Sequence, residues 1–201
     1  MVDKQTLNLI LPLERLPAFL LLLQKGVWVR IQTGCSVASL LTEQFAIKED
    51  YIAERITTLF LDFKPIDDLE TAYVNDGSIL ALSSAMPGLV GTTMRRGSHL
   101  AAMRGDISCS TQQRLVSVVG RIKVKLFNLL MIELGETLLS HGIILTNGEL
   151  VNLLSEMDDS FWKNVEAVTF GDQRTVPASL LKQLSSAAPD DEILFTVQFK
   201  S

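Results

Sequence analysis

The order of the secondary-structure signals in this chain repeats once, and this repeat constrains the fold more than any single motif does. Runs of β-branched and aromatic residues that predict strands alternate with helical patterns and tight turns. Matched runs lie about 109 to 116 residues apart and keep the same order in both halves, which predicts a duplicated fold. We predict strands at residues 6–11, 27–31, 57–63 and 78–83, with counterparts at 122–127, 143–145, 165–170 and 193–199.

Helices are predicted between these strands from the residues that begin or end them. Pro17 suits the first turn of a helix, where its missing N–H costs nothing, and Gly26 should end that helix. Ser36 is a predicted N-cap for the next helix. In the second half, an apolar helix over about residues 129–140 should stop at Gly142. Strands and helices distributed in this way predict an α+β fold.

The first half also resembles a known family. Its run "VWVRIQTGCSVASLL" resembles the second strand and the "TVAELL"-type helix start of small β-grasp sulfur carriers. Its run "TTLFLDFKPIDDLETAYVNDGSILALSSAMPG" resembles their "VAVNGKPV…L.DGDEVALFPPVAGG" tail, most specifically from Lys64-Pro65 to Asp76-Gly77-Ser78-Ile79-Leu80-Ala81-Leu82. Over about residues 6–91 the chain is therefore similar to the ubiquitin-like family of the molybdopterin-synthase small subunit and the thiamine sulfur carrier.

This resemblance implies tandem duplicated ubiquitin-like β-grasp domains, with the second half as a diverged repeat. The expected domains are residues 1–88 and 121–201, joined by a connector at residues 89–120. Carriers of this family end in a Gly-Gly carboxylate that an activating enzyme adenylates and that becomes a thiocarboxylate. Here the chain continues past the matching strand and contains no Gly-Gly pair. The resemblance therefore implies the fold but not sulfur transfer.

The connector is rich in glycine and arginine, and it lies in the most basic part of the chain. Residues 77–132 hold seven basic residues against one acidic residue, a net charge of +6, whereas the whole chain carries −5. We predict a β-hairpin whose arms are residues 92–95 and 100–104, around the turn Arg96-Gly97-Ser98. Residues 114–119 have the composition of a further strand, able to pair with a sheet edge of this chain or of a second copy.

Three arginines of this hairpin, Arg95, Arg96 and Arg104, are the candidate site for an anion or an acidic partner. Guanidinium groups bind carboxylates and phosphates through paired hydrogen bonds, which makes arginine the residue of choice for such sites. The alternative is a solvated hairpin whose charges serve solubility or pair with acidic residues of a neighbouring domain. Both interpretations remain open at this point.

The remaining chemistry-bearing residues exclude several classes of site. Cys35 and Cys109 form no CxxC pair, and His99 and His141 are the only histidines, which excludes a disulfide scaffold and a three-histidine metal centre. Ser36, like the other serines, lies in no GxSxG setting. We therefore expect no catalytic residues, no metal and no cofactor. The acidic total also argues against a nucleic-acid partner.

The most apolar run, residues 16–23, is too short to span a bilayer and lacks the flanks of a signal peptide. We therefore expect a cytoplasmic protein with no membrane partner. The leading functional hypothesis is a non-catalytic interaction or scaffold protein that binds a protein partner, or a second copy, through residues 90–120. One alternative is an enzyme with a small-anion site at the three arginines. Another is a carrier cut after Gly88 or Gly91 to expose a glycine carboxylate.

Overall fold

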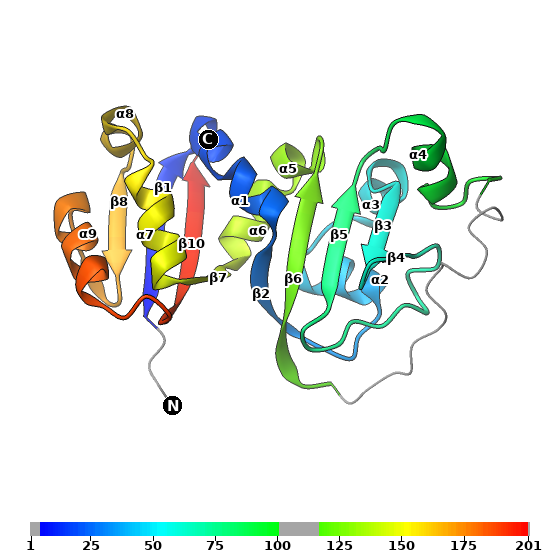
Figure 1. Ribbon diagram of the computed structural model, residues 1–201, viewed down its shortest axis with the longest axis horizontal. Helices are drawn as coiled ribbons and strands as arrows, with labels where there is room; N and C mark the ends of the chain where they lie inside the picture. Colours follow the sequence, from blue (N-terminus) through cyan, green and yellow to red (C-terminus); the bar gives the residue numbers. More distant parts are fainter. Residues whose placement is uncertain (1–4, 101–116, 201) are drawn as a thin grey trace. The chain divides into compact units, whose positions relative to one another are not determined.

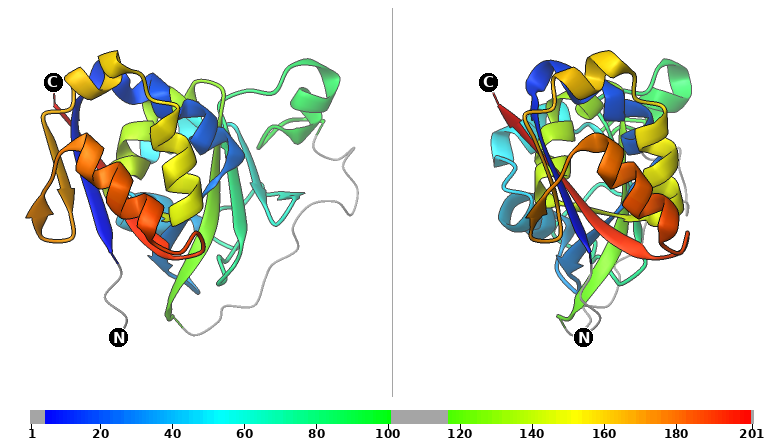
Figure 2. Two further views of the ribbon diagram at one scale, coloured as in Figure 1. Left: turned by 60° about the vertical axis from the view of Figure 1, so that its left-hand side comes forward. Right: turned by 90° about the vertical axis from the view of Figure 1, so that its left-hand side faces the viewer.

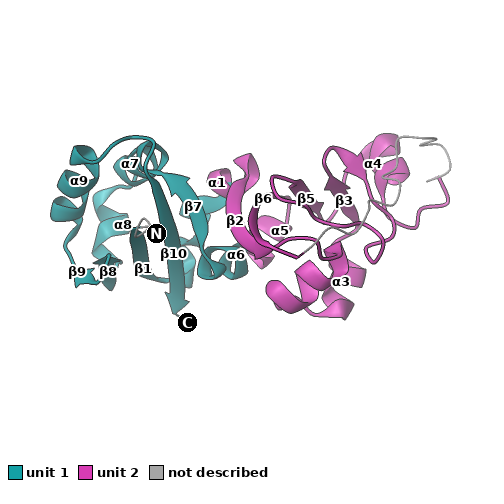
Figure 3. Ribbon diagram, turned by 90° about the horizontal axis from the view of Figure 1, so that it is seen from below, with its two compact units in different colours: residues 1–20, 135–201 teal, residues 21–134 magenta. Residues whose placement is uncertain are grey.

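The protein is a mixed α/β fold whose chain divides into two compact units (Figure 1). A computed structural model describes residues 5–100 and 117–200. Unit 1 combines residues 1–20 with residues 135–201, and unit 2 consists of residues 21–134 (Figure 3). Within the described residues the chain forms ten strands and nine α-helices. Unit 2 is therefore inserted in the sequence of unit 1.

Unit 2 contains a five-stranded mixed sheet in the order β2-β6-β5-β3-β4. Strand β6 is antiparallel to β2 and parallel to β5, and β3 is antiparallel to both β5 and β4. Its strands are β2 Val27–Gln32, β3 Thr58–Leu61, β4 Lys64–Pro65, β5 Ile79–Ser83 and β6 Val119–Phe127. Its helical segments are α1 Leu20–Lys25, which begins at the unit boundary, α2 Val37–Ser39, the π-helical turn η2 Leu40–Gln44, α3 Glu49–Arg55, α4 Gly88–Met94 and α5 Leu130–Glu133.

Unit 1 contains a second five-stranded sheet, in the order β7-β10-β1-β8-β9. Strand β10, red in Figure 2, is parallel to the blue β1. It is antiparallel to β7, and β8 is antiparallel to both β1 and β9. Its strands are β1 Thr6–Pro12, β7 Ile143–Thr146, β8 Ala167–Phe170, β9 Gln173–Arg174 and β10 Glu192–Lys200. Its helical segments are the 3₁₀ helix η1 Leu13–Phe19, α6 Gly135–His141, α7 Asn147–Ser155, α8 Asp159–Lys163 and α9 Pro177–Ser186.

The two sheets share one pattern of strand directions, but their central strands come from unexpected parts of the chain. All eight predicted strands are confirmed, with ends that differ by three residues or fewer. However, the first strand, β1, lies in the sheet of residues 135–201, and β6 lies in the sheet of residues 21–134. The compact units therefore do not follow the expected boundaries of 1–88 and 121–201.

The reason for this difference lies in how alike the two strands are. Leu7, Leu9 and Leu11 of β1 alternate with less buried residues, as Ile122, Val124 and Leu126 do in β6. Alternation with period two shows which side chains face a core, but it does not show which sheet the strand joins.

Several predicted helix boundaries are confirmed. Gly26 and Gly142 end α1 and α6 with φ of +98° and +102°, a conformation that favours glycine. The Ser36 hydroxyl accepts a hydrogen bond from the Ser39 backbone N–H, as an N-cap does. The predicted helix over residues 129–140 is two helices, α5 and α6, and Pro17 lies inside the 3₁₀ helix η1 rather than at the start of one α-helix.

The connector begins as a helix and not as a hairpin arm. Helix α4 covers residues 88–94, where the sequence predicted that a strand begins at Thr92. Gly91 is buried against the Met86 backbone carbonyl, in a space where any Cβ would collide with that oxygen. This close packing outweighs the strand preference of the neighbouring threonines. Residues 101–104 of the second predicted arm and residues 114–116 of the predicted further strand lie outside the described residues, and Val119 begins β6.

Candidate interaction surface

One face of the unit 2 sheet carries the candidate site. Figure 3 shows α3 on one side of this sheet, and the strand residues facing the helices are buried, among them Leu59, Leu61, Leu80 and Leu82. The alternate residues point to the other side, which we call the open face. The open face carries Trp28, Arg30, Phe60, Ile79, Ala81, Arg121, Lys123, Lys125 and Phe127.

The open face contains an apolar depression of about 450 Å³, which we call the hollow. Pairing of the strands assembles its floor, because Ala81 lies opposite both Phe60 and Lys125 in the sheet register. The chain after β5 forms a wall, and the Asn128 amide donates hydrogen bonds to the Ser83 hydroxyl at 2.9 Å and to the Ala85 carbonyl. The hollow is lined by Phe60, Phe63, Ile79, Ala81, Ser83, Ala85, Met86, Pro87, Lys125, Phe127 and Asn128.

Phe63, at the rim of the hollow, is the most unusual of these residues. Its side chain is 76% exposed, and its backbone has φ of +67° in the turn between β3 and β4. The preceding residue, Asp62, also has a positive φ, and its carboxylate accepts hydrogen bonds from the Ile79 N–H at 2.8 Å and the Ser78 hydroxyl at 3.0 Å. A bulky side chain rarely adopts this conformation, and such strain concentrates at functional sites.

Basic residues occupy the rest of the open face. Arg121, Lys123 and Lys125 follow one another at alternate positions of β6. The Arg121 guanidinium lies 5.2 Å and the Lys123 ammonium 5.6 Å from the centre of the Trp28 ring, within the range of cation–π attraction. None of the described residues on this face of β2, β3, β5 and β6 is acidic. The face therefore combines an apolar depression with a row of positive charge.

The structure describes two of the three arginines of the predicted anion site, Arg95 and Arg96. Arg95 is exposed at the end of α4, Arg96 is partly buried, and Arg104 lies outside the described residues. The Arg96 guanidinium donates to the Ile52 carbonyl at 3.1 Å. Burial lowers its pKa, and the nearby Asp67 opposes that shift.

The surroundings of Arg96 are acidic. It lines a separate depression of about 770 Å³ together with five carboxylates, Glu43, Glu49, Asp67, Asp68 and Glu70. Carboxylates around Arg96 make this depression unfavourable for an anion. The two glycines considered as processing sites lie in α4, Gly88 exposed at its start and Gly91 buried within it.

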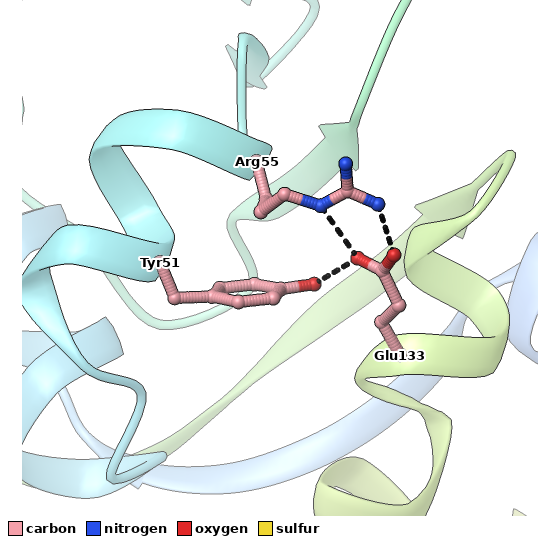
Figure 4. Close-up of polar contacts among 3 residues, drawn as sticks. All are labelled: Tyr51, Arg55 and Glu133. Carbon is pink, nitrogen blue, oxygen red and sulfur yellow. Dashed lines mark hydrogen bonds and ion pairs between the residues drawn. The ribbon is translucent and has the colours of Figure 1, made fainter.

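A polar cluster joins α3 to α5 (Figure 4). The Glu133 carboxylate accepts hydrogen bonds from the Tyr51 hydroxyl at 2.5 Å and from Arg55, whose guanidinium also forms an ion pair with it. The Arg55 hydrogen bond, followed by that from Tyr51, lowers the pKa of Glu133. Burial and the bond to Glu133 raise the pKa of Tyr51. The three side chains thus link α3 to α5 through their mutual hydrogen bonds and ion pair.

Other chemical sites are not found among the described residues. There, no three His, Cys, Asp or Glu side chains gather as a metal site requires. The Cys35 thiol donates to the Gln32 carbonyl at 3.2 Å, and burial raises its pKa, so it is not an activated nucleophile. None of the helices in residues 5–100 and 117–200 has the length and apolar composition needed to cross a bilayer.

Comparison with known proteins gives no family for this chain: no family model, no curated protein and no solved structure matches it. The hollow was not predicted from the sequence, although one signal was present. In "LDFKPI", Phe63 stands where the quoted carrier run "VNGKPV" has glycine, so an apolar side chain replaces a residue suited to the turn.

Proposed function

We propose that this protein is a non-catalytic, ubiquitin-like interaction protein that binds a protein partner at the hollow of unit 2. The observation that supports this most directly is Phe63, a bulky apolar residue kept largely exposed in a backbone conformation that disfavours it. Aromatic side chains beside an apolar depression are typical anchors of protein interfaces. The hollow is large enough to receive an apolar side chain of a partner.

The ubiquitin-like part of the proposal is consistent with the shared strand pattern of the two units. Each sheet has a central parallel pair flanked by antiparallel strands. We regard the fold as a β-grasp duplication in which the first strand of each half has joined the sheet of the other half. Oligomerisation through residues 90–120 is a separate part of the proposal, and light scattering of the full chain tests it.

The test is co-purification of proteins with the tagged full chain, followed by mass spectrometry. Three forms are compared: the unchanged chain, Phe63→Asn, and the control Leu21→Asn. Leu21 is 70% exposed but lies in α1 and is not among the lining residues of the hollow. We expect a partner that the unchanged chain and the control retain and that Phe63→Asn loses. Recovery of the same proteins with all three forms would contradict the proposal.

The processed-carrier alternative has its own measurement. An intact mass of the native protein equal to the full 22.2 kDa excludes it. A fragment ending at Gly88 or Gly91 would replace the interaction proposal with the carrier hypothesis. The buried position of Gly91 within α4 makes the peptide bond after it a poor site for cleavage.

A further inference from the structure

The lining of the hollow has one charged residue, and this residue defines the chemistry of a bound group. Eight of the eleven lining residues are apolar side chains of Phe, Ile, Ala, Met or Pro in the strands, the turn and the wall, and none is acidic. Lys125 alone carries a charge there. A group that fills the hollow should therefore be apolar, and a group that contacts Lys125 at the edge should be an anion.

The backbone around Lys125 holds this side chain in place. Gly26 lies beside it, so close that a Cβ at position 26 would stand 2.6 Å from Cγ of Lys125. In the register of β5 and β6, Lys125 lies opposite Ala81, whose small side chain leaves room above the sheet. A lysine whose methylene groups pack against the protein keeps its ammonium in water and loses less conformational freedom when it binds an anion.

The rest of the open face favours the same sign of partner charge. Arg121 and Lys123 extend the row of cations from Lys125 toward Trp28. Nucleic-acid binding requires many phosphate contacts, whereas the open face carries four basic residues, of which Lys125 alone borders the hollow. The arrangement instead suits a partner segment that carries one apolar side chain and a few negative charges.

We infer that the partner presents an apolar side chain to the hollow and an adjacent carboxylate to Lys125. This inference depends on the proposed function, because it names the chemistry of the segment that binds at the same surface. A further carboxylate of that segment is attracted by Lys123, which lies two residues from Lys125, or about 7 Å at the usual strand rise. The partner segment is thus both acidic and apolar.

Selection from a library of random short peptides displayed on phage tests the inference with the full chain as the target. We expect enrichment of peptides in which an aromatic or aliphatic residue lies next to Asp or Glu. Selected peptides are then synthesised and their affinity is measured for the unchanged chain, Phe63→Asn, Lys125→Glu and the control Lys182→Glu. Lys182 is an exposed lysine of α9 in unit 1, so it receives the same change of charge elsewhere.

The expected result is loss of binding with Phe63→Asn, at least about fivefold weaker binding with Lys125→Glu, and no change with Lys182→Glu. Raising salt from about 0.1 M to about 1 M shortens the screening length from about 10 Å to about 3 Å, so it weakens binding to the unchanged chain. The salt effect should be smaller for a peptide in which Gln replaces the acidic residue.

Each contrary outcome has a separate meaning. Peptides that need Phe63 but are insensitive to Lys125→Glu would overturn the inference and leave the proposed function standing. A failure of every selected peptide to depend on Phe63 would overturn both. Two further probes are the dye 8-anilinonaphthalene-1-sulfonate and a single-stranded oligothymidine. If either bound in a Lys125-dependent way and displaced the peptides, the hollow would be a site for a small amphiphile or a nucleic acid, and the inference would be wrong.

Discussion

At the scale of the residue, the fold holds Phe63 in a backbone conformation that phenylalanine disfavours. A non-glycine residue in the left-handed region costs about 1–2 kcal/mol, whereas Asn adopts it with less strain. Because the Phe63 side chain is largely exposed, little packing is lost when it is replaced. We therefore predict that Phe63→Asn raises the free energy of unfolding by about 0.5–1 kcal/mol, measured by urea denaturation, while partner binding is lost. Lower stability of this variant would show that Phe63 is kept for packing.

The hydrogen bonds and ion pair of Glu133 predict that the stability of the fold depends on pH. The pKa of Glu133 is lowered in the folded state from its ordinary value of 4.5, so its charge stabilises the fold above that value. This stabilisation is lost as the pH falls through the lowered pKa. Glu133→Gln should therefore be less stable than the unchanged chain at neutral pH, and this difference should shrink steadily from about pH 5 toward pH 3. A difference that stays constant with pH would contradict the ion pair with Arg55.

At the scale of the element, strands were predictable and the connector was not. Alternating apolar residues located all eight strands, and Gly26, Ser36 and Gly142 located helix ends because these residues act through local backbone geometry. Helix α4 depends instead on the close approach of Gly91 to Met86, a tertiary contact that local preference does not encode. Among the described basic residues of 77–132, Arg121, Lys123 and Lys125 lie on β6, whereas Arg95 and Arg96 follow the end of α4.

Gly91→Ala tests the structure of this element. The added Cβ collides with a backbone carbonyl, so α4 must shift or open, at a cost of about 1–3 kcal/mol of local stability. Hydrogen exchange should show faster exchange of the amides in residues 88–96, including the Arg95 N–H that donates to the Gly91 carbonyl at 3.0 Å. The control is Thr92→Ala on the exposed side of α4, which should change little. If Gly91→Ala were as well protected as the unchanged chain, the helix assignment would be wrong.

At the scale of the whole molecule, the chain positions of β1 and β6 distinguish this architecture from two sequential domains. Leu9 of β1 is fully buried and lies opposite Val197 of β10 and Val168 of β8. Leu126 of β6 is equally buried and lies opposite Leu82 of β5. With domains at residues 1–88 and 121–201, Leu9 would instead support the sheet of residues 79–83, and Leu126 that of residues 192–200. The two arrangements thus assign each leucine to the opposite sheet.

Leu9→Ala and Leu126→Ala remove the same group from these two sites, and each should cost about 2–5 kcal/mol because a buried cavity remains. Native-state hydrogen exchange then locates the loss, since local opening reports the stability of the unit that contains each amide. We predict that Leu9→Ala speeds exchange in β8 and β10 and spares β3 and β5, and that Leu126→Ala does the reverse. The opposite assignment would restore two sequential domains. If either variant sped amide exchange equally in both sheets, the two units would unfold together. A unit that opens alone would leave amide exchange in the other unit unchanged.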